Sequence, residues 1–268
     1  MTIELKDRKG QAVTDWRDWP PPKVHHQWRA ARSAMELARA WFTSPSPCVP
    51  VQLSSLLDTS SLTRGMAITR GIPECVTPLP GRGEGRNHDL VLVGRSDAGQ
   101  VTICVEAKAD EAFGEVVGKY LAQTKKKAAA EGRRTNLPAR ASALVQLLFG
   151  PDASSEAEPW RSLRYQLLTG AAGALLQADL DGSEIAVFVV HEFLTEAVDR
   201  GGKVRANASD LEKFVGALVG ESHGSKSVGN LAGPVRFSTG KFLHRPLSLL
   251  LGKVTFDWRR THLRVCRG

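Results

Sequence analysis

The stretch from Asn87 to Glu111, NHDLVLVGRSDAGQVTICVEAKADE, limits the possible folds more than any other part of the chain. Two apolar runs flank the short polar segment RSDAGQ, which predicts two antiparallel strands joined by a tight turn. Side chains alternate between faces along a strand, so a turn at Asp97 and Ala98 gives one wholly apolar face: Leu90, Leu92, Val101, Ile103, Val105 and Ala107. Other parts of the chain must cover that face, so we expect the hairpin to belong to a larger buried sheet.

The second face of the predicted hairpin is apolar in its middle and charged at one end. The same turn places Asp89 opposite Glu106, with Cβ atoms about 5 Å apart, and Lys108 beside Glu106. A turn shifted by one residue would separate these side chains, so the grouping depends on the register. We favour the register that keeps each face chemically uniform.

Two carboxylates at this separation repel one another unless positive charge lies between them. A hard divalent cation such as Mg²⁺ supplies that charge and takes oxygen ligands. Asp89 and Glu106 are therefore the predicted metal ligands, and the carbonyl of Ala107 can add a further oxygen. Lys108 can orient or deprotonate a water molecule, or neutralise charge on a phosphate. Taken singly, Asp89 is also explained as a strand-start cap, and Glu106 with Lys108 as a surface ion pair.

The rest of the chain alternates predicted helices and strands, which is typical of an α/β fold with a mixed sheet. In the first helix, the expected apolar stripe is Trp28, Ala31, Met35, Ala38 and Phe42. Ser209 is the predicted N-cap of the last helix. Residues 65–76 have the composition of a strand but are not assigned. The expected helices are 25–42, 51–58, 111–130, 160–178 and 209–220, and the further strands are 142–149, 183–193, 234–238 and 249–258.

The length of 268 residues suits one domain over residues 1–268, with a core at about 24–191 and a C-terminal extension at about 192–268. The hairpin motif within that core resembles the PD-(D/E)xK nuclease superfamily, which has the restriction-endonuclease-like fold. The matching residues are the HD pair ending in Asp89 and the VEAK sequence ending in Lys108. The expected elements also follow the family's helix-strand-strand-strand-helix-strand core, with one early strand not placed. His88 stands where the family has proline.

The resemblance implies a mixed sheet flanked by helices and a catalytic site at Asp89, Glu106 and Lys108. The two acids would bind Mg²⁺ or Mn²⁺, and Lys108 would help to activate the attacking water. Many members carry a further glutamate on the first helix, for which Glu36 is the candidate. An exposed Glu36 paired with Arg32 or Arg39 is the alternative. Gln166 is a second helical candidate, although its spacing from Tyr165 differs from the pattern of the exonuclease branch.

The net charge of +8 favours a polyanionic partner. Together with the resemblance, this charge predicts a nuclease that acts on nucleic acid, with DNA as the expected substrate. Arg82 and Arg86 lie in a glycine-rich loop and Lys125 and Lys126 in a lysine run, and we expect these four to contact phosphates. The alternative is a catalytically inactive module on the same fold that binds nucleic acid or protein. Solvated basic surfaces would explain the same clusters without any partner.

Composition excludes several other classes of protein. The four cysteines form no Cys-x-x-Cys pair, so a zinc knuckle is not expected. The chain has no apolar run long enough to span a membrane and no secretory signal, so we expect a soluble cytoplasmic protein without a membrane partner. A homodimer remains an alternative to a monomer. Residues 242–252 would supply its interface or else form a packed C-terminal strand, and we favour the strand.

Overall fold

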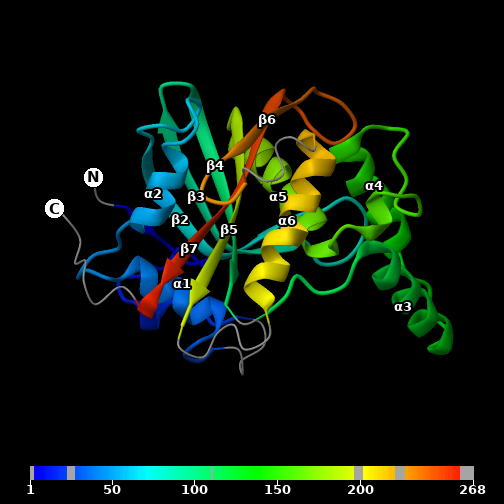
Figure 1. Cartoon of the computed structure of the whole chain (residues 1–268), viewed down its shortest axis with the longest axis horizontal. Coiled ribbons are helices and arrows are strands. Elements are labelled where there is room, and N and C mark those ends of the chain that lie inside the picture. The colour runs from blue at the N-terminus through cyan, green and yellow to red at the C-terminus, as the bar shows by residue number, and fades with distance from the viewer. Residues whose placement is uncertain (1–2, 23–27, 110, 196–201, 221–226, 260–268) are drawn as a thin grey trace.

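The hairpin lies at the centre of a seven-stranded mixed sheet in the computed structural model, which describes residues 3–22, 28–109, 111–195, 202–220 and 227–259. Across the sheet the order is β1-β2-β3-β4-β5-β7-β6. Helices cover both faces, giving three layers (Figure 1). The expected α/β class with a mixed, helix-flanked sheet is confirmed. The strands are β1 (Glu4–Leu5), β2 (Ala67–Thr77), β3 (Arg86–Ser96), β4 (Gly99–Lys108), β5 (Ile185–Leu194), β6 (Ala232–Phe237) and β7 (Leu247–Asp257).

The strand directions divide the sheet into two halves. β2, β3 and β4 form an antiparallel meander, while β4, β5 and β7 run parallel to one another. The short β1 adds parallel to β2, and β6 adds antiparallel to β7. β2 is the strand that the sequence analysis left unassigned. The C-terminal part of the chain supplies two strands of this same sheet, so it is an integral part of it.

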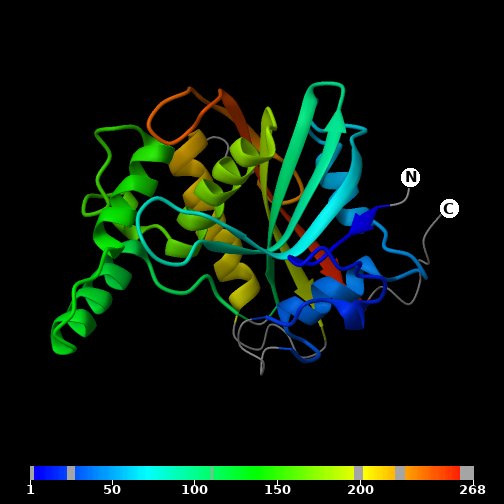
Figure 2. The same cartoon turned by 180° about the vertical axis from the view of Figure 1, so that it is seen from behind.

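Two groups of helices cover the two faces of the sheet. One hydrophobic core contains buried residues of α1 and α2, and we call it the α1-side core. The other, the α5-side core, contains buried residues of α3, α4, α5 and α6. Figures 1 and 2 show these groups on opposite sides, with α3 projecting from the body. None of the described helices is both long and apolar enough to span a membrane. The helices are α1 (Ser33–Trp41), α2 (Val51–Leu57), α3 (Val117–Ala130), α4 (Leu137–Phe149), α5 (Tyr165–Asp181) and α6 (Lys203–Val219).

The predicted strand at residues 142–149 is wrong, because this segment is the second half of α4. Periodicity alone does not distinguish a short apolar run in a strand from one in a buried helix. The buried positions Leu137, Ala141, Leu144, Val145 and Leu148 follow steps of three and four, which is the helical repeat. Pro138 in the first turn is compatible with a helix start.

Four helix predictions also need correction. α5 begins at Tyr165 and not at residue 160, because Trp160–Ser162 form a separate 3₁₀ turn. Ala31 has a left-handed φ of 64°, and α1 begins only at Ser33. Of the expected stripe, only Ala38 is a buried residue of α1, and Ala34, Leu37 and Trp41 are buried with it. α3 begins at Val117, so residues 111–116 are not helical. Ser209 lies inside α6, whose N-cap is Gly202. In each case the helix boundary was misplaced, which is the least reliable part of a sequence-based assignment.

The C-terminal segment 242–252 forms a packed strand where it enters β7, as favoured above. Leu249, Leu250 and Leu251 are completely buried between the two cores. β7 lies between β5 and β6, so both of its edges are occupied. Its leucines therefore do not supply an exposed dimer interface.

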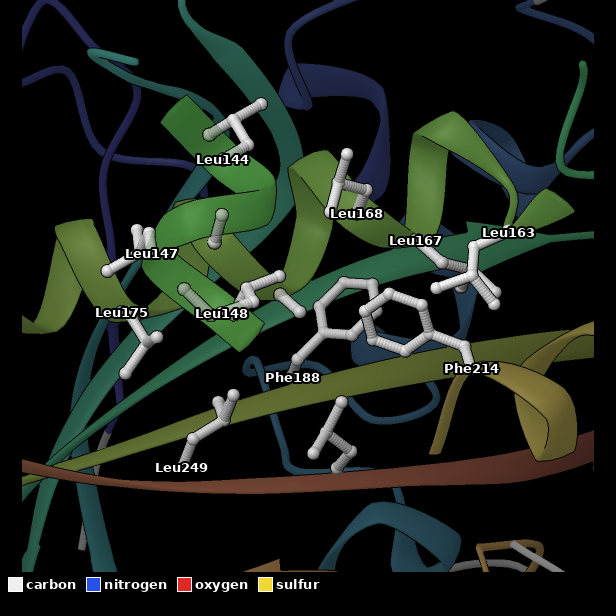
Figure 3. Packing of buried hydrophobic residues seen from close by; sticks show 14 of the residues in the cluster. Leu144, Leu147, Leu148, Leu163, Leu167, Leu168, Leu175, Phe188, Phe214 and Leu249 are labelled. Carbon is white, nitrogen blue, oxygen red and sulfur yellow. The ribbon is translucent and has the colours of Figure 1, made fainter. Parts of the chain in front are cut away.

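α5 packs closely on the sheet through two glycines. Leucines of α4 and α5 surround Phe188 of β5 and Phe214 of α6 (Figure 3). A Cβ atom placed on Gly170 would overlap the ring of Phe188, and one on Gly173 would lie 2.8 Å from Nε2 of His88. Because glycine has no side chain, the backbone of α5 can approach β5 at Phe188 and β3 at His88. His88 is next to Asp89, at the charged end of the hairpin.

Substitution of Gly170 by alanine is expected to lower the free energy of unfolding by about 1–3 kcal/mol, since the added methyl group overpacks the core. Urea denaturation of the purified variant measures this change. Gly240→Ala is the control, because a Cβ atom there has no neighbour within 4 Å. Equal stability of Gly170→Ala and the wild type would contradict the close packing of α5.

Candidate active site at the end of the hairpin

The hairpin has the register on which the predicted site depends. Its pairs run from Ser96 with Gly99 at the turn to Leu90 with Val105, which confirms the turn at Asp97 and Ala98. The predicted apolar face packs into the α1-side core. Val91 and Cys104, on the other face, pack into the α5-side core. The charged end of the hairpin therefore lies on the side that α5 covers.

Glu106 and Lys108 form a buried ion pair next to α5. Both residues are only 4 % exposed, and Nζ of Lys108 lies 2.7 Å from Oε1 of Glu106. The same Nζ donates a hydrogen bond to Oε1 of Gln166 at 3.1 Å and lies 5.3 Å from the ring centroid of Phe113. Burial lowers the pKa of Lys108 to about 8, although the charge of Asp89 opposes this effect. Gln166, predicted as a site residue, thus contacts the predicted catalytic lysine.

Arg86 supplies a second cation to this group. Its Nη2 contacts Oε2 of Glu106, so both oxygens of that carboxylate have a positively charged partner. The Arg86 side chain is only 12 % exposed. Arg86 was expected to lie in a loop and contact phosphate. It is instead the first residue of β3, and its contact with Glu106 makes it part of the site.

Asp89 lies where β3 separates from β4. The recorded pairing of the two strands ends at Leu90, and Oδ2 of Asp89 accepts a hydrogen bond of 2.6 Å from the backbone N–H of Ala107. Burial of the carboxylate raises the pKa of Asp89, whereas this hydrogen bond and the nearby Lys108 lower it. The predicted pairing of Asp89 with Glu106 lies one step beyond the last register pair, Leu90 with Val105. Asp89 is hydrogen-bonded to Ala107, and Glu106 precedes Ala107 in the sequence.

Glu111 belongs to the site, although the sequence analysis interpreted it as the start of a helix. That interpretation is wrong because α3 starts six residues later. Its Oε1 accepts from Oγ of Ser33 on α1 at 2.7 Å, and its Oε2 accepts from the N–H of Ala109 at 2.9 Å. Its negative charge acts on both Asp89 and Lys108. An acid three residues beyond Lys108 was the only sequence signal, and helix starts commonly carry the same signal.

Glu74 of β2 is a second acid that the sequence analysis missed. It is 3 % exposed and accepts a hydrogen bond of 2.6 Å from Nδ2 of Asn87. Burial, and next the negative charge of Asp89, raises the pKa of Glu74 to about 7. No sequence pattern indicated it, because the strand that carries it was not assigned.

Glu36 is buried, with 2 % exposure, so the exposed alternative is wrong. Its recorded contacts are nevertheless local to α1. Oε1 accepts from the N–H of Ala31 at 2.7 Å and lies 3.6 Å from Nη1 of Arg39. The alternative was therefore wrong about exposure, but the ion pair that it predicted between Glu36 and Arg39 is present. It is Glu111, bonded to Ser33 at the start of α1, that connects this helix to the site.

The other predicted phosphate contacts lie outside this group of contacts. Arg82 is exposed, and its backbone carbonyl accepts hydrogen bonds from Arg140 and Asn136 near the start of α4. Arg140 also binds the carbonyls of Pro80 and Glu84, so the glycine-rich loop is attached to α4 and is not a free arm. Lys125 and Lys126 are exposed on the projecting helix α3, where Lys125 pairs with Glu156 at 3.0 Å. These residues contact none of the acids described above.

The side chains at the hairpin end suit a divalent cation by their chemistry. Mg²⁺ binds through one or two carboxylates and keeps several waters, and Asp89, Glu106 and the carbonyl of Ala107 provide such oxygens. No group of three or more His, Cys, Asp or Glu side chains within the described ranges is arranged as a metal site. Arg86 and Lys108 contact the two oxygens of Glu106, so a cation bound there would compete with these ion pairs.

Comparison with protein families gives one match. Residues 9–255 match the family described as a domain of unknown function (DUF6946). The chain belongs to the DUF6946 family. No curated protein and no solved structure matches it. The match to DUF6946 includes β2 to β6 and most of β7, and it leaves out β1. It therefore contains the whole charged group at the hairpin end.

Proposed function

We propose that this DUF6946 protein is a metal-dependent nuclease that hydrolyses phosphodiester bonds, with DNA as its substrate. The observation that carries the proposal is the arrangement around Lys108. Nζ of Lys108 is fixed between Glu106 and Gln166. Asp89 accepts a hydrogen bond from the backbone of Ala107, which lies between Glu106 and Lys108 in the sequence. A lysine amine and two carboxylates on neighbouring strands match the chemistry expected of a PD-(D/E)xK site.

The order of the elements supports the same proposal. α1 and α2 precede the three antiparallel strands β2, β3 and β4, and helices then lead to β5 parallel to β4. With β2 assigned, the early strand missing from the sequence comparison is present. This order agrees with the core of restriction-endonuclease-like proteins, and we propose that fold for the chain. The net charge of +8 favours binding to a phosphate backbone.

Each residue of the site has a role that its contacts support. Asp89 and Glu106 would hold Mg²⁺ or Mn²⁺ with Ala107, and the bound metal would polarise the scissile phosphate and activate water. Gln166 positions the amine of Lys108, which orients the attacking water or neutralises charge on the phosphate. Arg86, once released from Glu106, is free to bind a phosphate oxygen. Arg82, Lys125 and Lys126 would contact the backbone further from the cleaved bond.

A catalytically inactive module on the same fold is the second candidate function. The observation that favours it is the pairing of both carboxylate oxygens of Glu106 with Arg86 and Lys108, because these two cations already compensate its buried charge without any metal. The inactive module would bind nucleic acid or protein but would not depend on divalent cations. Metal dependence therefore separates the two functions.

Purified protein is expected to cut or nick DNA in the presence of Mg²⁺ or Mn²⁺ and to lose this activity in EDTA. The test measures cleavage of single-stranded, double-stranded, branched and modified DNA, and of RNA, by gel electrophoresis. Metal-dependent cleavage that Asp89→Asn abolishes supports the proposal, because the amide keeps the side-chain shape but removes a charged ligand. Absence of cleavage of every substrate would overturn the nuclease function and favour the inactive module.

A further inference from the structure

Tyr120 is an exposed aromatic residue near the start of the projecting helix α3 (Figure 1). It is 37 % exposed, and no other tyrosine, tryptophan or phenylalanine in the described ranges is exposed. Its ring lies against the ring of Tyr165, the first residue of α5, with the two centroids 4.7 Å apart and the planes inclined by 35°. Tyr120 therefore combines a supported ring with a surface that is open to solvent.

Backbone hydrogen bonds fix the start of α3 on the start of α5. The N–H of Tyr165 donates to the carbonyl of Glu115 at 3.1 Å, and the N–H of Val117 donates to the carbonyl of Leu163 at 2.9 Å. The residues between these partners form an antiparallel bridge. Because these bonds involve only the backbone, they set the position of Tyr120 on Tyr165 without depending on a side-chain rotamer.

The paired rings lie beside the proposed active site. Tyr165 is followed directly by Gln166, whose Oε1 accepts the hydrogen bond of 3.1 Å from Nζ of Lys108. The segment that leads into α3 starts from the same place, since the ring centroid of Phe113 is 5.3 Å from that Nζ. A group that binds to the ring of Tyr120 is therefore held next to the side chains that surround Lys108.

Positive side chains accompany the two rings. Burial, and next the neighbouring Tyr120, raises the pKa of Tyr165 to about 12, whereas the charges of Arg140 and Arg86 act in the opposite direction. Lys127 is exposed on α3 seven residues after Tyr120, so it lies on the same face about 10 Å further along the helix. Proteins that bind single-stranded nucleic acid combine aromatic rings with such a path of positive charge.

We propose that Tyr120, supported by Tyr165, stacks on an unpaired base, so that the protein prefers DNA that is single-stranded beside the cleaved bond. The inference rests on the proposed nuclease function and narrows its substrate. In a duplex each base is already stacked on its neighbours, so a protein ring can stack only on a base that has left the helix. Stacking of this kind accepts every base, since each one has an aromatic face.

The test measures fluorescence anisotropy of a fluorescein-labelled DNA oligonucleotide in EDTA at low salt, so that binding is observed without cleavage. Tyr120→Ala is expected to weaken binding of a single strand about tenfold and binding of a duplex of the same sequence less than about twofold. Tyr120→Phe keeps the ring and is expected to bind both like the wild type. Leu180→Ala shortens an exposed apolar side chain near the other end of α5 and is the control, with both affinities unchanged.

An oligonucleotide without bases separates stacking from other effects of the substitution. An abasic single strand gives the ring nothing to stack on, so the wild type and Tyr120→Ala are expected to bind it equally. Weaker binding of the abasic strand by Tyr120→Ala would assign the loss to the backbone contacts or to the fold, and it overturns the inference. Wild-type affinity of Tyr120→Ala for the normal single strand, an equal loss on the duplex, or a wild type that binds no single strand overturns it as well.

The outcomes also separate this inference from the proposed function. Metal-dependent cleavage that does not depend on Tyr120 leaves the nuclease function standing and removes the stacking role. Binding of the single strand that depends on Tyr120, in a protein that cuts no DNA, overturns the nuclease function and assigns the ring to the inactive module. Both the binding assay and the cleavage assay use the full chain, so the two results are directly comparable.

Discussion

Substitution of Lys108 by methionine is expected to reduce metal-dependent DNA cleavage by about 10²–10³-fold or more, as loss of a charge-stabilising donor does in other active sites. The amine of Lys108 is the cationic group fixed between a proposed metal ligand, Glu106, and the α5 side chain Gln166. Methionine has a similar length but provides neither a charge nor a hydrogen-bond donor. The measurement is the initial rate of cleavage at saturating Mg²⁺.

The variant is expected to fold because Glu106 keeps a second cation. Arg86 continues to contact Oε2 of Glu106 after the lysine amine is removed, so no isolated carboxylate is left buried. Methionine also fills an irregular apolar space well, and the ring of Phe113 lies beside Lys108. Circular dichroism and the melting temperature will report whether the fold persists.

Lys213→Met is the matched control, since Lys213 is exposed on α6 and belongs to no part of the proposed site. The same loss of charge there is expected to leave the cleavage rate within about twofold, because exposed charges contribute little. Cleavage by Lys108→Met at the wild-type rate would contradict the role of the lysine. Equal losses in both variants would attribute the effect to net charge alone.

The sequence was sufficient to predict the hairpin because two independent constraints agree there. The polar turn segment centres the hairpin on Asp97 and Ala98, and alternation of side chains then assigns every residue to a face. The same alternation indicated that Glu106 and Lys108 share a face, and their contact at 2.7 Å agrees with it. Local patterns of this kind are readable because neighbouring strands of a hairpin are also neighbours in sequence.

The remaining partners of these charges could not be predicted, since they come from distant parts of the chain or from misassigned elements. Glu74 lies on β2, which has proline and glycine within it and therefore reads poorly as a strand. Arg86 was assigned to a glycine-rich loop, whereas it begins β3 and is paired with Glu106. Gln166 was proposed through a resemblance, and only the packing of α5 on the sheet brings it to Lys108.

Helix α4 shows a different reason for failure. Its sequence, LPARASALVQLLF, ends in an apolar run as long as a typical strand, and the α/β alternation favoured a strand at that place. Tertiary packing decides the structure here, because α4 lies against α5 and completes the α5-side core. A parallel partner for β4 is instead provided by β5, some 80 residues further along the chain.

Removal of the buried lysine of β7 is expected to cause a larger loss of stability than Gly170→Ala does. Lys253 is 2 % exposed, and its Nζ lies 2.7 Å from Oε2 of Glu192, which is completely buried on β5. Lys253→Met leaves Glu192 without this lysine in the interior, and breaking such a pair typically costs about 3–5 kcal/mol. The free energy of unfolding from urea denaturation measures the loss.

The double variant Glu192→Gln with Lys253→Met tests whether breaking this charge pair causes the loss. It is expected to recover most of the stability, because a neutral amide needs no counter-ion and still accepts the hydrogen bond from Nδ2 of Asn207. A double variant as unstable as Lys253→Met would instead indicate that packing of the lysine chain dominates. Glu192 pairs in register with Lys108, and Asn207 also donates to the carbonyl of Glu111 at 3.0 Å. The buried pair therefore anchors α6 and β5 beside the proposed site, so Lys253→Met is also expected to lower cleavage, and the double variant to restore it.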